Sequence, residues 1–82
     1  MNADAYVYEA LSHAYSMGGE CSVTRYAIGV AYRKLAQRFA ISREIPGPAL
    51  ALALSRLVKY NWATQETIGG VIRYAPKKRR QS

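Results

Sequence analysis

The sequence predicts an α+β fold that is mainly helical, with three helices followed by a small β-hairpin. Apolar residues recur at helical spacing in three separate stretches. Near the C-terminus, two stretches rich in β-branched residues flank a double glycine, which is a tight-turn signal. A chain of 82 residues has the size of one domain, and no repeat or linker divides it. We therefore expect one folded domain over residues 1–76 and a separate tail over residues 77–82.

The first predicted helix runs from Ala3 to Met17. Val7 and Leu11 lie on its apolar stripe, and Gly18-Gly19 is typical of a helix end. The connector that follows, residues 20 to 23, has room for one rung of a strand.

The second predicted helix runs from Thr24 to Phe39, and the side chain of either Ser22 or Thr24 is suited to capping its start. Glycine at position 29 weakens the first turns by about 1 kcal/mol relative to alanine, so a start near Val30, after a looser turn, is the alternative. The predicted core face has helical spacing and comprises Ile28, Ala31, Tyr32, Leu35 and Phe39.

The third predicted helix runs from Pro48 to Tyr60. Proline suits the first position of a helix, where the missing N–H group has no partner in any case. This helix is apolar on nearly all sides, and a large exposed apolar patch is unusual on a monomer. A second subunit of a homodimer would cover such a patch, and close packing of the first helix would do the same. The candidate partner contacts are Ala49, Leu52 and Ala53.

The predicted hairpin joins strands from Asn61 to Thr67 and from Val71 to Ala75. Gly69-Gly70 can adopt the positive φ angles that a type I′ turn requires at both positions. This turn places Glu66 opposite Arg73, and opposite charges favour such a cross-strand pair.

Charge is distributed unevenly along the chain, whose net value is +7. Residues 1–24 contain three acidic residues and no Lys or Arg, which gives −3. Residues 25–82 contain twelve Lys and Arg against two acidic residues, which gives +10. This asymmetry indicates a polyanionic partner for the basic part, although solubility alone also accounts for some basic domains.

The tail continues this charge directly after the hairpin. It contains four consecutive basic residues and is expected to be disordered by itself, since it is too charged to pack. The sequence "PKKRR" is also similar to a nuclear import signal, which would apply in a eukaryotic host.

Two stretches, "KLAQRFAIS" and "ALSRLVKYNWATQETIGGVIRYAP", resemble the winged helix-turn-helix DNA-binding domain. The resemblance implies that the third helix is a recognition helix and that the hairpin is the wing. It further implies a double-stranded DNA-binding protein, either a small transcription regulator or a nucleoid-type architectural protein. One departure is the turn over residues 40 to 47, which is longer than the family's tight turn.

The DNA-binding residues that this resemblance implies lie on the helices, the wing and the tail. The third helix has few side chains that read base edges, so contacts are expected mainly with the phosphate backbone. The candidates are Arg33, Arg43, Ser55, Arg56, Lys59, Arg73, Lys77, Lys78, Arg79 and Arg80.

Other classes of function find little support in the sequence. Cys21 is the single cysteine and His13 the single histidine, so we expect no metal site, and we expect no cofactor. The acidic residues are scattered and no phosphate-binding loop motif occurs, so neither an enzyme nor a small-molecule substrate is expected. The longest apolar run, residues 49 to 54, is far shorter than the roughly 18 residues of a membrane span. We expect a cytoplasmic, nucleoid-associated protein, or a nuclear one in a eukaryote.

Two alternatives remain open. One is a protein-interaction winged helix, a subunit of a larger assembly that uses the third helix as its contact. The other is an RNA-bound protein of ribosomal type, because phosphate contacts alone do not separate RNA from DNA.

Overall fold

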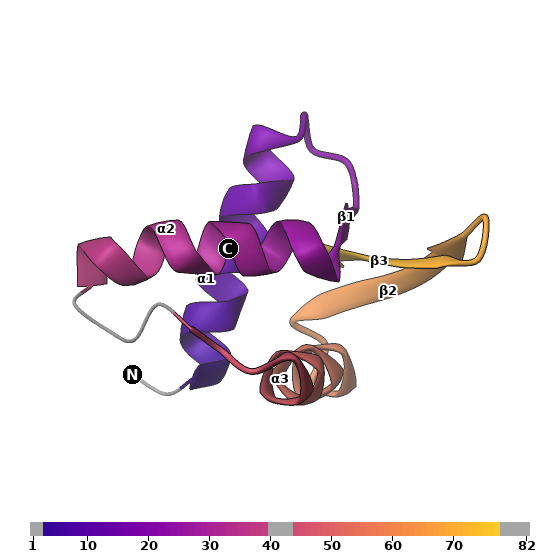
Figure 1. The fold of residues 1–82 in the computed structure, drawn as a ribbon. Helices are drawn as coiled ribbons and strands as arrows, with labels where there is room; N and C mark the ends of the chain where they lie inside the picture. The colour runs from indigo at the N-terminus through magenta and orange to yellow at the C-terminus, as the bar shows by residue number, and fades with distance from the viewer. Residues whose placement is uncertain (1–2, 40–43, 78–82) are drawn as a thin grey trace, which may run out of the picture.

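Three helices and a small antiparallel sheet make up the computed structural model, which describes residues 3–39 and 44–77. Their order agrees with the order predicted from the sequence, and the α+β class is confirmed (Figure 1). None of the helices in these residues is long and apolar enough to cross a membrane. The elements are α1 Ala3–Met17, β1 Val23–Thr24, α2 Arg25–Phe39, α3 Gly47–Lys59, β2 Ala63–Ile68 and β3 Val71–Pro76.

The sheet has the strand order β1-β3-β2, so β3 is central. The predicted hairpin register is confirmed: Ile68 pairs with Val71 and Glu66 lies opposite Arg73. The connector before α2 adds the third strand, in which Val23 pairs with Tyr74. This pairing ties the start of α2 to the base of the hairpin.

Helix α2 begins at Arg25, one residue after the predicted start at Thr24, and the alternative start near Val30 is wrong. The Thr24 hydroxyl accepts a hydrogen bond of 3.3 Å from the Ala27 N–H, as the predicted cap requires. Burial of Ile28 on the core side of the first turns offsets the low helix propensity of Gly29. At Gly29 the helix also lies close to α3, because a Cβ built there would be 3.8 Å from Leu50 Cδ2.

Helix α3 ends in a Schellman motif, so β2 starts further along the chain than predicted. The Trp62 N–H donates to the Leu57 carbonyl at 2.8 Å and the Asn61 N–H to the Val58 carbonyl at 3.1 Å. Asn61 adopts a positive φ of 67°, which asparagine tolerates better than most residues. Strand β2 consequently begins at Ala63, two positions after the predicted start.

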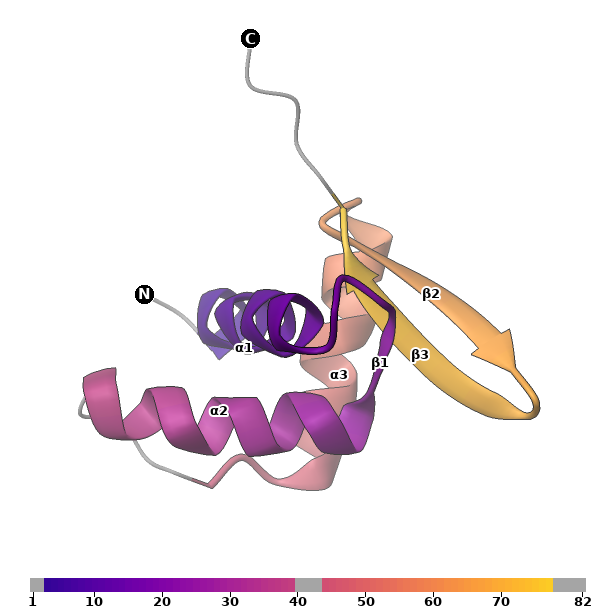
Figure 2. The same cartoon turned by 90° about the horizontal axis from the view of Figure 1, so that it is seen from above.

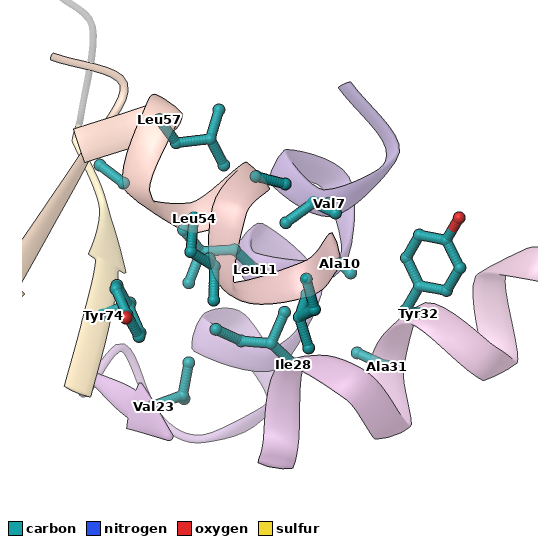
Figure 3. Close-up of a cluster of buried hydrophobic side chains, with 13 residues drawn as sticks. Val7, Ala10, Leu11, Val23, Ile28, Ala31, Tyr32, Leu54, Leu57 and Tyr74 are labelled. Carbon is teal, nitrogen blue, oxygen red and sulfur yellow. The ribbon is translucent and has the colours of Figure 1, made fainter. Parts of the chain in front are cut away.

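The core lies where α1 meets α2, α3 and β3 (Figure 3). Leu11, Ile28 and Leu54 are fully buried, one from each helix, and Tyr74 closes the cluster from the sheet. Tyr32 lies at the edge of the cluster with its hydroxyl pointing away from it, as expected for a tyrosine at a core margin (Figure 3). Tyr26 does not follow this pattern: its side chain is 82% exposed.

Candidate nucleic-acid interface

The solvent-facing stripe of α3 carries few side chains of the types that contact nucleic acid. Pro48, Leu52, Ser55 and Lys59 recur at helical spacing, and all four are exposed. Among them, Ser55 offers one hydroxyl and Lys59 one charge, with the Lys59 ammonium 5.9 Å from the centre of the Tyr60 ring. A hydroxyl and an ammonium group suit phosphate contacts better than base contacts.

Arg56, the third polar residue predicted on this helix, forms an ion pair with Asp4 of α1. Its Nη2 lies 2.7 Å from Asp4 Oδ1 and its Nε lies 2.8 Å from Oδ2, which is a bidentate pair. The hydrogen bond from Arg56 is the main reason that the pKa of Asp4 is lowered, and the same bond raises the pKa of Arg56. The guanidinium is thus turned toward α1 and partly neutralised.

Two further predicted residues form contacts within the protein. The Arg73 guanidinium donates a hydrogen bond of 2.8 Å to the Ser22 carbonyl. This bond joins β3 to the connector before α2, although Glu66 lies opposite Arg73 in the register. The Lys77 ammonium donates to Asn61 Oδ1 at 3.1 Å and is exposed. Lys77 therefore lies beside the end of α3, with its charge open to solvent.

Arg33 lines a groove of about 1190 Å³ between α2, the start of α3 and the tip of the hairpin. Arg25 also lines this groove, and sequence reasoning missed it. Both arginines are exposed, and neither guanidinium forms an ion pair or hydrogen bond with other described residues. Glu44 contributes one carboxylate to the same lining. No sequence signal marked Arg25, because only the pairing of β1 with the hairpin strand β3 brings the start of α2 beside the hairpin.

One predicted partner contact is wrong. Ala53 is 1% exposed and packs in the core, because α3 turns this side toward α1. Leu52 is 56% exposed and Ala49 is exposed, so these two remain on the surface. Trp62 is 38% exposed and stands edge-on to Tyr8, with 5.5 Å between ring centres.

The outer end of the hairpin is apolar. Ile68, Val71 and Ile72 are all exposed, on either side of the turn at Gly69-Gly70. Four of the predicted DNA contacts lie outside the described residues: Arg43, Lys78, Arg79 and Arg80.

Within residues 3–39 and 44–77, no group of three His, Cys, Asp or Glu side chains is placed to hold a metal ion. Cys21 is exposed and unpaired by any disulfide. Comparisons with family models, with curated proteins and with solved structures found no match.

Proposed function

We propose that this protein binds double-stranded DNA as a winged helix-turn-helix domain and contacts mainly the phosphate backbone. In this arrangement α2 and α3 form the helix-turn-helix and the β2–β3 hairpin is the wing. The strand order β1-β3-β2 supports it, because β1 anchors the wing beside the start of α2. A regulator of transcription and an architectural protein both fit this mode of binding.

The observation that carries the proposal is the groove between the helices and the wing. Two arginines, Arg25 and Arg33, line this groove, where a duplex following α3 and the wing would bring its phosphates. Lys59 and Lys77 extend the positive charge to the other end of α3. The net charge of +7 would draw DNA toward the protein from a distance.

A pair of double variants tests this placement. Arg25→Gln with Arg33→Gln removes two charges from the groove, whereas Lys34→Gln with Arg38→Gln removes two exposed charges of α2 that do not line it. Fluorescence anisotropy with a labelled duplex gives the slope of log affinity against log salt. We expect the groove variant to flatten this slope by about 1.8, since each phosphate contact contributes about 0.9.

The control variant is expected to change the slope much less. Equal changes in the two variants would mean that the positive charge acts without a defined site. Complete absence of duplex binding by the unmodified protein at low salt would exclude the function itself.

The exposed Leu52 favours a second candidate, which is a protein-interaction winged helix. On α3 this leucine lies beside Arg56, whose charge Asp4 already partly neutralises, so the helix face is less suited to DNA. A homodimer through this face is the simplest form of that candidate. Sedimentation of the protein and of Leu52→Gln separates the two functions. If the protein forms a dimer that Leu52→Gln dissociates, and if it does not bind the duplex, the result would support a protein-interaction subunit.

A further inference from the structure

Exposed aromatic side chains and lysines gather where α3 ends and β2 begins. Tyr60 is 60% exposed and Trp62 38%, and Lys59 and Lys77 are exposed beside them. The Lys59 ammonium lies 5.9 Å from the centre of the Tyr60 ring, and the Lys77 ammonium donates to Asn61 Oδ1 at 3.1 Å. Neither lysine forms an ion pair with another described residue, so both positive charges are available to a ligand. We call Lys59, Tyr60, Trp62 and Lys77 the aromatic–lysine cluster.

The fold holds the backbone of this cluster in place. The Schellman motif at the end of α3 fixes the turn, and the Lys77 N–H donates to the Trp62 carbonyl at 2.9 Å. The Trp62 ring also packs edge-on against Tyr8 of α1. Packed helices and strands therefore present the rings and the amines, and a site on such elements is more precisely positioned than one on a loop.

The cluster lies at the opposite end of α3 from the groove of Arg25 and Arg33. The first residues of α3 line that groove, whereas the cluster follows the last turn of the helix. Figure 2 shows the start of α3 beside α2 and its end beside the base of the hairpin. A helix of 13 residues is about 20 Å long, so the groove and the cluster contact different parts of a ligand.

The chemistry of the cluster suits nucleotides whose bases are unpaired. An exposed aromatic ring stacks on the flat face of a base, and a basic side chain beside it contacts the phosphate. Within an intact duplex the neighbouring base pairs cover these faces, so the rings find stacking partners only where a strand is open. A protein partner is less suited to this surface, because protein interfaces are depleted in lysine.

We infer that the aromatic–lysine cluster binds the unpaired nucleotides of a DNA strand, with bases stacked on Tyr60 and Trp62. The ammonium groups of Lys59 and Lys77 then contact the phosphates of the same strand. This inference goes beyond the proposed duplex binding, because it assigns a second site to the other end of α3. The preferred DNA is a duplex with a single-stranded overhang, whose paired part occupies the groove while its open strand reaches the cluster.

The single tryptophan of the chain provides a direct readout, since stacking of a base on Trp62 quenches its fluorescence. The protein is titrated with a blunt duplex, with the same duplex carrying a thymidine overhang, and with free thymidine and uridine oligonucleotides. Tyr60→Leu removes one stacking ring and keeps an apolar side chain. Phe39→Leu is the matched control, because Phe39 is also an exposed aromatic residue and belongs to neither site. Circular dichroism checks that both variants fold like the unmodified protein.

We expect the overhang to raise the affinity about tenfold over that of the blunt duplex and to quench the Trp62 fluorescence. Tyr60→Leu should remove most of this gain in affinity, and Phe39→Leu should keep it. A full gain in Tyr60→Leu would contradict the inference.

The other outcomes separate this inference from the proposed function. Equal affinities for the two duplexes, without quenching, would overturn the inference and leave the proposed function intact. Quenching by the thymidine strand without any binding of the blunt duplex would support the inference and exclude the proposed duplex binding. Tighter binding of the uridine strand than of the thymidine strand would assign the cluster to RNA and overturn the inference.

Discussion

Asp4 holds Arg56 away from any ligand of α3, and replacing Asp4 with Asn would release this guanidinium. The substitution removes the carboxylate that accepts both hydrogen bonds and raises the net charge from +7 to +8, since one negative charge is lost. If DNA lies along α3, Arg56 then becomes an additional phosphate contact. The slope of log affinity against log salt should steepen by about 0.9, which is an extra loss of about 3.5-fold between about 50 and about 200 mM salt.

The matched control is Glu9→Gln, which makes the same change in net charge on the same helix. Glu9 is exposed and forms no ion pair with the described residues, so its removal frees no cation. Fluorescence anisotropy at several salt concentrations compares the two variants with the unmodified protein. Equal slopes for Asp4→Asn and Glu9→Gln would refute the reasoning that Asp4 masks a DNA contact.

The same pair links stability to pH. The pKa of Asp4 lies below its ordinary value of 3.8, mainly because Arg56 donates hydrogen bonds to the ionised carboxylate. A lowered pKa in the folded state means that the stabilisation is complete above the ordinary value and is lost as pH falls through the folded-state value. The side chains are 39% and 26% exposed for Arg56 and Asp4, so the effect is small and screened by salt. Thermal melts should show Asp4→Asn less stable at neutral pH and equal to the unmodified protein in strong acid.

Three further substitutions test the fold by urea unfolding. Leu54→Ala should lower the free energy of unfolding by about 2–5 kcal/mol, because Leu54 is fully buried and the substitution leaves a cavity; a loss below about 1 kcal/mol would contradict its central position. Gly29→Ala should raise stability by about 0.5–1 kcal/mol, because a methyl group there meets Leu50 at an ordinary distance of 3.8 Å; a fall would mean that α2 and α3 lie closer than described. Asn61→Ala should lower stability by about 1–2 kcal/mol because of the positive φ angle, whereas Asn61→Gly should not. Equal losses of stability in the two variants would mean that Asn61 stabilises the fold through its side chain and not through its backbone conformation.

Local signals in the sequence were sufficient for the order of elements and for the hairpin. The double glycine fixes the turn, and the turn fixes the pairing of Ile68 with Val71. The alternative start of α2 near Val30 was wrong because low propensity at Gly29 is a local signal, whereas burial of Ile28 depends on the tertiary fold.

Sequence reasoning was weakest for side chains whose partners lie far along the chain. Arg56 and Asp4 are separated by 52 positions, and only the packing of α1 on α3 brings them together. Arg73 reaches the Ser22 carbonyl for a similar reason, because β1 pairs with β3. The position of Ala53 was ambiguous because α3 is apolar on several sides, so periodicity did not show how far its buried face extends.

The most direct test of the proposed function is the affinity of the complete chain for a duplex of about 30 base pairs, measured by anisotropy across salt concentrations with a structured RNA as competitor. We predict that log affinity falls linearly with log salt, with a slope near −0.9 for each phosphate contacted, and that the RNA competes no better than unlabelled duplex. Absence of binding at low salt, despite a net charge of +7, would contradict DNA binding. Displacement by RNA at a much lower concentration than by duplex would assign the basic surface to RNA.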